Sequence, residues 1–199
     1  MIRTFVAAEL DSTLTHAIAG VQEKLKRELH RLGPRVRLQW VRPDSIHLTL
    51  KFLGAIEQSQ VGIIVQALAN AAREYVPFSV DVKGFGVFPD IRSPRVLWMG
   101  LSGPTDRLIH LAGSIDAAVA PLGFPAERKP YSPHLTMARV KEQSHAIGEA
   151  LAKSGVMREC ACLGILSIQS VALMQSVPSP SGSIYSCLGR VLLGHESLA

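Results

Sequence analysis

Two short segments of the chain repeat the same potentially catalytic side chains. Residues 43–49 read P-D-S-I-H-L-T, and residues 130–136 read P-Y-S-P-H-L-T, so that five of seven positions agree. The two histidines, His47 and His134, lie one in each half of the chain. A lone histidine in a strand is more often structural than catalytic. The repeat of the whole segment favours a shared chemical role instead.

Each repeated segment is predicted to be a strand, in which residues two apart point to the same face. His47 and Thr49 then share one face, and His134 and Thr136 share another, while the leucine inside each motif points into a core. If the halves of the chain pack with approximate two-fold symmetry, the two strands lie side by side. Their polar faces would then line one cleft that holds two imidazoles and two hydroxyls.

This set of groups suits displacement at phosphorus, where the attacking and leaving oxygens are roughly in line. One imidazole takes a proton from water and the other gives a proton to the departing oxygen. Histidine can do both because its ordinary pKa lies near neutral pH. The threonine hydroxyls can donate hydrogen bonds to the equatorial oxygens, on which charge accumulates. A strained cyclic phosphate ester is therefore a fitting substrate.

Phe52 and Arg139 each follow a motif histidine by five residues. On a straight strand this odd offset turns a side chain away from the cleft, so a role in the site requires a bend. The basic segment with Arg35, Arg37 and Arg42 either steers RNA or lies on a solvated strand face.

Helical and strand patterns alternate along the whole chain, which indicates an α+β fold. The 199 residues, 47% of them apolar, suit one domain or two small lobes that share a core. Helical spacing covers residues 14–29, 61–68, 108–119 and 144–153, and strand-like segments include 5–10, 37–41, 46–53, 78–87, 95–101, 134–140, 163–175 and 185–193. Residues 178–182 are predicted to form a loop.

Composition narrows the class of partner and the compartment. The net charge of +5 favours an anionic partner such as nucleic acid. Three cysteines without framework spacing point to a reducing compartment, and no apolar run is long enough to span a membrane, so we expect a cytoplasmic protein. A catalytic zinc needs a third protein ligand that neither motif supplies, so we expect no metal and no other cofactor.

Beyond these motifs, the chain resembles the two-histidine phosphoesterase superfamily over nearly its whole length. It is most similar to the bacterial and archaeal RNA 2′,3′-cyclic phosphodiesterases, historically called 2′-5′ RNA ligases. The resemblance is carried by residues 3–7 (R-T-F-V-A), 47–54 (H-L-T-L-K-F-L-G), 84–89 (G-F-G-V-F-P), 94–98 (P-R-V-L-W) and 132–139 (S-P-H-L-T-M-A-R). The paired H-x-T motifs are specific in combination, and Met137 stands where leucine is usual.

The resemblance implies a bilobed fold, each lobe an antiparallel sheet flanked by helices, with the active-site cleft between them. Residues 1–199 would form a single domain of two intertwined lobes, which we expect to be a monomer. The implied activity is hydrolysis of a terminal 2′,3′-cyclic phosphate of RNA to a 2′-phosphate. The implied roles are general acid for His47, general base for His134, phosphate binding for Thr49, Thr136 and Arg139, and a contact to the base for Phe52. The acid and base roles are interchangeable by sequence.

Three alternatives remain open. The same site run backwards would ligate a 2′,3′-cyclic end to a 5′-hydroxyl, which an assay with paired tRNA halves would detect. A different small substrate, such as a cyclic ADP-ribose phosphate or a 2′-5′ oligonucleotide, would use the same groups. A non-catalytic RNA-binding module would keep its function after both histidines are replaced by alanine.

Overall fold

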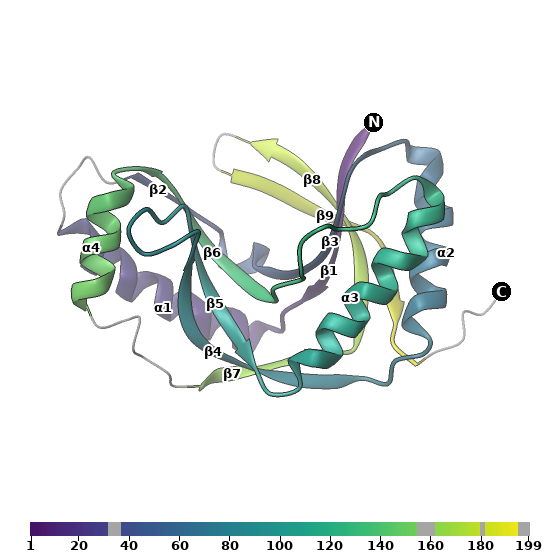
Figure 1. The fold of residues 1–199 in the computed structure, drawn as a ribbon, viewed down its shortest axis with the longest axis horizontal. Coiled ribbons are helices and arrows are strands. Elements are labelled where there is room, and N and C mark those ends of the chain that lie inside the picture. Colours follow the sequence, from purple (N-terminus) through teal and green to yellow (C-terminus); the bar gives the residue numbers. More distant parts are fainter. Residues whose placement is uncertain (32–36, 155–161, 180–181, 195–199) are drawn as a thin grey trace.

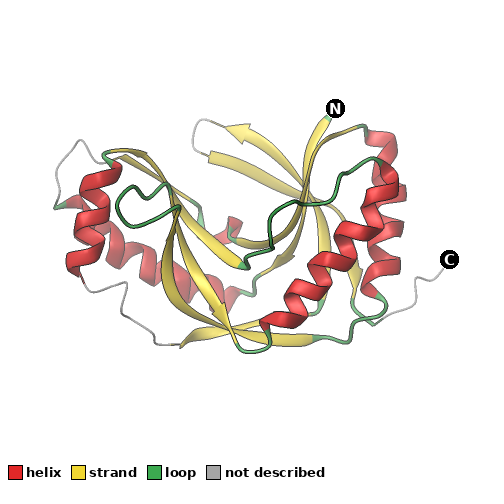
Figure 2. Ribbon diagram, in the orientation of Figure 1, coloured by secondary structure: helices red, strands yellow, loops and turns green. Residues whose placement is uncertain are grey.

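One curled antiparallel sheet runs through the molecule, with two helices packed against each half (Figure 1 and Figure 2). The computed structural model of the protein describes residues 1–31, 37–154, 162–179 and 182–194. The predicted α+β class is confirmed. The strands are β1 (Ile2–Glu9), β2 (Arg37–Trp40), β3 (His47–Ile56), β4 (Phe78–Phe88), β5 (Val96–Ser102), β6 (His134–Glu142), β7 (Cys162–Ile168), β8 (Ser170–Ser179) and β9 (Gly182–Leu192).

The order of the strands divides the sheet into two similar lobes. The sheet runs β7-β4-β5-β6-β3-β1-β8-β9, and β2 adds to β6. The first lobe contains β3, β1, β8 and β9 with the helices α2 (Val61–Ala72) and α3 (Thr105–Val119). The second lobe contains β6, β5, β4, β7 and β2 with the helices α1 (Ser12–His30) and α4 (Ser144–Ser154). The bilobed arrangement expected from the resemblance is therefore present.

Two of the helices are exchanged between the lobes. Helix α1 follows β1 of the first lobe, but it packs against β7 and α4 of the second. Helix α3 follows β5 of the second lobe, but it packs against β3 and α2 of the first. Figure 1 shows α1 beside α4 at one end of the molecule and α3 beside α2 at the other. Each lobe thus contains one helix that directly follows a strand of the other lobe in the sequence.

Helix α1 illustrates why these segments fold where the sequence predicts. The carboxylate of Asp11 accepts a hydrogen bond of 2.8 Å from the backbone N–H of Leu14, which caps the first turn. The buried face repeats at helical spacing through Ile18, Leu25 and Leu29. A polar residue, Gln22, interrupts this apolar stripe and is also buried.

The prediction of one strand over residues 163–175 is wrong. The segment forms two strands, β7 and β8, which meet at Gln169 and pair with different lobes. Strand β7 pairs with β4, and β8 pairs with β1. The loop predicted for residues 178–182 is wrong at three positions, because Pro178 and Ser179 belong to β8 and Gly182 begins β9, while residues 180–181 lie outside the described residues.

A few remaining predictions concern cysteines, metals and membranes. Cys162 and Cys187 are free thiols, whereas Cys160 lies outside the described residues. In the described part of the chain, no three side chains of histidine, cysteine, aspartate or glutamate are grouped as a metal site would require. Over the same residues, every helix is too short or too polar to cross a lipid bilayer.

Candidate active site

The two H-L-T motifs meet at the junction of the lobes. Leu48 of β3 and Leu135 of β6 are antiparallel partners, and both side chains are 0% exposed. Continuing this antiparallel register by one residue in each direction places His47 opposite Thr136 and Thr49 opposite His134. All four side chains line one cleft of about 660 Å³. The strand contact thus brings together the two imidazoles and two hydroxyls that the sequence predicts for one site.

Each histidine is fixed by the backbone of its own motif. Nδ1 of His47 lies 2.9 Å from the carbonyl oxygen of Ser45, and Nδ1 of His134 lies 2.7 Å from the carbonyl oxygen of Ser132. A carbonyl can only accept, so Nδ1 carries the hydrogen in both rings. Nε2 is consequently the nitrogen that can take or give a proton.

Aromatic rings surround both imidazoles. Phe5 stacks on His47 with ring centroids 4.6 Å apart, and Tyr185 meets the same imidazole edge-on at 5.0 Å. Phe88 meets His134 edge-on at 5.0 Å, and Trp98 lies 6.2 Å from it. Together with the Nδ1 hydrogen bonds, these contacts restrict the orientation of each ring.

The surroundings of His47 favour its neutral form in the empty cleft. Burial lowers the pKa of this imidazole below its ordinary value, and the guanidinium of Arg139 lowers it further. The hydrogen bond to the Ser45 carbonyl and the carboxylate of Glu9, its neighbour on β1, act in the opposite direction. Because Arg139 lowers the pKa of His47, its positive charge lies close enough to act on the imidazole.

A β-bulge follows the H-L-T motif in both strands. In β3, Thr49 is opposite Ala7 and Lys51 is opposite Val6, which leaves Leu50 as the extra residue. In β6, Thr136 is opposite Trp98 and Ala138 is opposite Leu97, which leaves Met137 as the extra residue. The extra residue therefore occupies the same place in both motifs, three positions after the histidine.

The two bulges turn Phe52 and Arg139 toward the cleft. An extra residue reverses the alternation of faces, so the odd offset from each histidine now leads to the same face. Both side chains line the cleft, and Phe52 is 60% exposed. The bend that the sequence required for these two residues is present in both strands.

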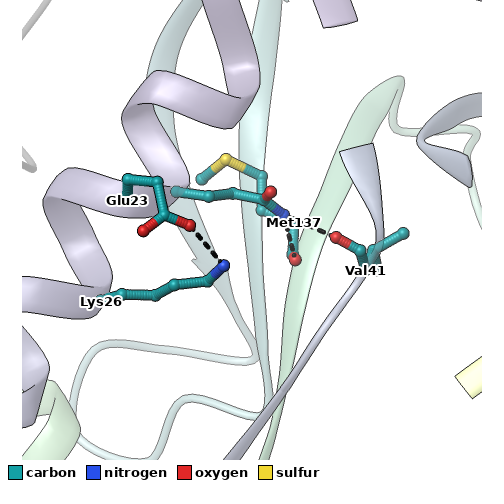
Figure 3. A network of polar contacts seen from close by, with 5 residues as sticks. Glu23, Lys26, Val41 and Met137 are labelled. Carbon is teal, nitrogen blue, oxygen red and sulfur yellow. Dashed lines mark hydrogen bonds and ion pairs between the residues drawn. The ribbon is translucent and has the colours of Figure 1, made fainter. Parts of the chain in front are cut away.

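A buried glutamine of α1, Gln22, supports the bulge of β6; Figure 3 labels the two residues whose carbonyl groups accept from it, Val41 and Met137. The side-chain amide of Gln22 donates to the carbonyl oxygens of Val41 and Met137 at 2.8 Å and 3.0 Å. The backbone N–H of Val41 also donates to the Met137 carbonyl, at 2.9 Å. Gln22 is 1% exposed, so the polar atoms of the bulge find protein partners where water is excluded.

A buried lysine supports the other bulge. Lys51 follows the extra residue of β3 and forms an ion pair with Asp116 of α3. Its ammonium also donates to the carbonyl oxygen of Pro125 at 2.7 Å, and Glu127 lies 3.8 Å away. Each exchanged helix therefore places one polar side chain beneath the bulge of the lobe on which it packs.

Sequence reasoning missed several residues that shape the site, among them Gln22, Lys51 and Tyr131. Tyr131 donates from its hydroxyl to the carbonyl oxygen of Thr49 at 2.8 Å, and burial raises its pKa, so the hydroxyl stays a donor. The only signal for Tyr131 in the sequence was its position inside the second repeated segment, residues 130–136. The charged side chains among the cleft-lining residues are Arg3 and Arg139, without any carboxylate, which favours an anionic ligand.

Comparison with known proteins agrees with this geometry. The model of the family described as LigT like Phosphoesterase matches residues 14–98 and 100–185, each of which contains one motif. An RNA 2′,3′-cyclic phosphodiesterase of Aquifex aeolicus is 32% identical over 180 residues, which cover 89% of this chain and 92% of the relative. One of Methanothermobacter thermautotrophicus is 31% identical over 185 residues, covering 93% and 95%.

Two solved structures show the same fold. A protein of Thermus thermophilus superposes with a TM-score of 0.77 and 25% identity, covering 98% of this chain and 100% of the other. LigT of E. coli, crystallised with 3′-AMP, superposes with a TM-score of 0.74 and 22% identity, covering 98% and 99%.

Proposed function

Because the chain belongs to the LigT-like phosphoesterase family, we propose that it hydrolyses the terminal 2′,3′-cyclic phosphate of RNA to a 2′-phosphate, without a metal ion. The observation that carries this proposal is the pairing of Leu48 with Leu135, since it brings two imidazoles to one cleft whose charged lining residues are arginines. The relatives from Aquifex aeolicus and Methanothermobacter thermautotrophicus, both named RNA 2′,3′-cyclic phosphodiesterase, support the choice of substrate.

In the proposed reaction, Nε2 of His134 takes a proton from water as the water oxygen attacks phosphorus. The bond from phosphorus to the 3′ oxygen breaks, and Nε2 of protonated His47 gives its proton to that oxygen. The phosphate remains on the 2′ oxygen. Thr49 and Thr136 donate hydrogen bonds to the non-bridging oxygens, while the charge of Arg139 balances the developing negative charge. The aromatic ring of Phe52 contacts the nucleobase.

The acid role of His47 depends on the substrate. Burial lowers the pKa of His47 in the empty cleft, which favours the neutral ring. A phosphate anion placed beside the ring stabilises the imidazolium and raises its pKa again. We therefore propose that substrate binding itself raises the pKa of His47, so that this ring takes up the proton that it later donates.

The first experiment incubates the purified protein with a short RNA that ends in a 2′,3′-cyclic phosphate, in the presence of EDTA. Wild type is compared with His47→Ala, His134→Ala and, as a matched control, His16→Ala, whose side chain is exposed on α1 outside the cleft. We expect the 2′-phosphate from wild type and the control, and a loss of at least about a hundredfold in both cleft variants. An inactive wild type, fully active cleft variants or loss of activity in EDTA would each contradict the proposal.

A second experiment assigns the two histidines. A substrate with sulfur in place of the 3′ oxygen has a leaving group that departs without protonation. We expect this substrate to restore activity to His47→Ala and not to His134→Ala. The reverse pattern would exchange the acid and base roles.

We also propose that the protein works as a monomer in the cytoplasm. Free thiols at Cys162 and Cys187 fit a reducing compartment, and the four motif side chains come from one chain. Light scattering coupled to size-exclusion chromatography measures the mass in solution, and a dimer would contradict the first part of the proposal.

A further inference from the structure

A narrow recess opens beside the catalytic cleft. It has a volume of about 90 Å³ and lies between β2, the segment that leads to the first motif, and the ends of β8 and β9. Ser45, Arg139 and Tyr185 line both the recess and the cleft, so the two spaces form one continuous groove. Ser45 also holds His47 through its carbonyl oxygen, at 2.9 Å from Nδ1.

The recess is shaped by contacts between the lobes. Strands β8 and β9 belong to the first lobe and extend as a hairpin toward the second (Figure 1). A Cβ at Gly182, the first residue of β9, would be in ordinary contact with the side-chain nitrogen of Gln39 on β2, at 3.8 Å. Gln39 is in turn the register partner of Arg139. The hairpin and β2 thus form two walls of the same space.

The charges of the recess favour an anion. Its charged lining residues are Arg42 and Arg139, and none of its lining residues is acidic. Asp44 accepts hydrogen bonds from Nε and one terminal nitrogen of Arg42, so it fixes the guanidinium in place. A guanidinium has five N–H donors, and this contact leaves donors of Arg42 for a second partner.

The size of the recess selects the kind of anion. The recess is much smaller than the cleft, about 90 Å³ against about 660 Å³, so it suits a small anionic group such as a phosphate rather than a second nucleotide. The terminal nucleotide of an RNA carries its 2′,3′-cyclic phosphate on one side of the ribose and the next phosphate on the 5′ oxygen. A second phosphate site one sugar away from the catalytic histidines is therefore what an RNA end requires.

We propose that this recess binds the phosphate on the 5′ oxygen of the terminal nucleotide, with Arg42 as its main cation. The inference rests on the proposed function and narrows it: the preferred substrate is an RNA chain or a 5′-phosphorylated nucleotide rather than a cyclic nucleoside phosphate. Arg42 acts in binding and specificity, and not in proton transfer. The hairpin of β8 and β9 then covers the RNA backbone just upstream of the reacting end.

The test compares three substrates: adenosine 2′,3′-cyclic phosphate, the same molecule with a 5′-phosphate, and the dinucleotide that ends in this cyclic phosphate. Wild type is compared with Arg42→Gln and with Arg37→Gln. Arg37→Gln is the control, because it also removes one positive charge. Arg37 lies in β2, pairs with Glu142 and lines neither the recess nor the cleft. Thermal unfolding of each variant verifies that it is folded.

For wild type and Arg37→Gln, we expect kcat/KM to be about tenfold higher for the two substrates that carry the upstream phosphate. Arg42→Gln should lose this preference through a higher KM, while its rate with adenosine 2′,3′-cyclic phosphate stays unchanged. KM for the dinucleotide should also rise less steeply with salt concentration in Arg42→Gln, because one charge–charge contact that salt screens is removed.

The outcomes separate this inference from the proposed function. Equal kcat/KM for all three substrates in wild type, or equal losses of kcat/KM in the two arginine variants, would overturn the recess proposal and leave the proposed hydrolase activity intact. A higher kcat/KM for the monoester than for the dinucleotide identifies a free 5′-phosphate as the ligand, whereas an equal or higher value for the dinucleotide shows that the recess accepts the phosphodiester of an RNA backbone. If wild type cleaves none of the three, the hydrolase proposal falls and the recess proposal falls with it.

Discussion

The side-chain nitrogen of Gln22 lies 3.0 Å from the carbonyl oxygen of Met137, the extra residue of the bulge in β6. This hydrogen bond joins α1, which follows β1 of the first lobe in the sequence, to β6 of the second lobe, the strand that carries His134. Arg139 faces the cleft because of that bulge. The amide of Gln22 therefore influences an arginine that it does not touch.

Replacing Gln22 with leucine should weaken both the fold and the binding of substrate. The substitution leaves buried carbonyl groups with fewer donors, so we expect the free energy of unfolding to fall by about 1–3 kcal/mol. The loss of support for the bulge should raise KM by on the order of tenfold through Arg139, with a smaller change in kcat. Urea denaturation and steady-state kinetics measure the two effects.

Gln66→Leu is the matched control for this substitution. Gln66 is exposed on α2, where its amide contacts only the side chain of Asn70 among the described residues. We expect the control to stay within about 0.5 kcal/mol of wild type, with unchanged kinetics. If Gln22→Leu behaves like the control, the bulge does not depend on the glutamine.

Removing the charge of Lys51 should destabilise the first lobe. Its side chain is buried with Asp116, so Lys51→Met leaves a partly buried carboxylate without its cation. We expect a loss of about 2–3 kcal/mol, below the range for fully buried pairs because Asp116 keeps some contact with water. The double variant Lys51→Met/Asp116→Leu should recover part of that loss, as measured by urea denaturation in a double-mutant cycle. Additive losses would show that the ion pair is not the stabilising contact.

The pKa of His47 should respond in opposite directions to its two charged neighbours. The carboxylate of Glu9 raises this pKa, so Glu9→Gln should lower it. The guanidinium of Arg139 lowers the pKa, so Arg139→Gln should raise it toward about 6.5. NMR titration of the imidazole measures both shifts. Glu142→Gln serves as the control, because Glu142 pairs with Arg37 at the far end of β6; shifts of the same sign in the first two variants would refute the assignment.

The lowered pKa of His47 also predicts how stability depends on pH. Below about pH 6.5, the unfolded chain binds a proton at this ring more tightly than the folded protein does. The free energy of unfolding should therefore fall as the pH decreases from about 6.5 toward the lowered pKa, and this contribution should be constant above that range. His47→Gln should lack it, so its stability relative to wild type should improve between about pH 7.5 and about pH 5.

Gly86 should be intolerant of any side chain. A Cβ at this position would lie 2.1 Å from the ring of Trp98, its partner on β5. Gly86→Ala should therefore shift that ring and, through it, His134, at a cost of about 1–3 kcal/mol in unfolding free energy and with lower activity. Gly20→Ala, in α1 with open space around it, should instead be neutral or stabilising. Tryptophan fluorescence reports the movement, and an unchanged spectrum with full activity would contradict it.

The sequence predicts the parts of this fold that repeat with a regular period. Helical spacing locates α1, and the alternation in H-L-T gives the shared face of each histidine and threonine. The bulges leave no such mark, because Leu50 and Met137 look like ordinary core residues of a continuing strand. Strand alternation alone therefore predicts that Phe52 and Arg139 point away from the cleft. The register of the paired strands shows the bulges, which place both side chains at the cleft.

The partners of the helices were also hidden in the sequence. Periodicity identifies which face of a helix is buried, but not the sheet that buries it. The resemblance implied intertwined lobes, but for this reason the sequence did not identify α1 and α3 as the exchanged helices, nor did it explain the role of Gln22 within an apolar stripe. The break at Gln169 was missed for a related reason, since the apolar pattern continues from β7 into β8 although the two strands pair with different lobes.

The pairing of β1 with β8 has a consequence for the order in which the cleft can form on the ribosome. Strand β1 is the first to be synthesised, yet Phe5, which stacks on His47, is the register partner of Met174. The aromatic wall of that histidine is therefore complete only when most of the chain has left the exit tunnel. A nascent chain that already carries both H-L-T motifs still lacks a finished site, so activity appears together with the folding of the whole protein and not half by half.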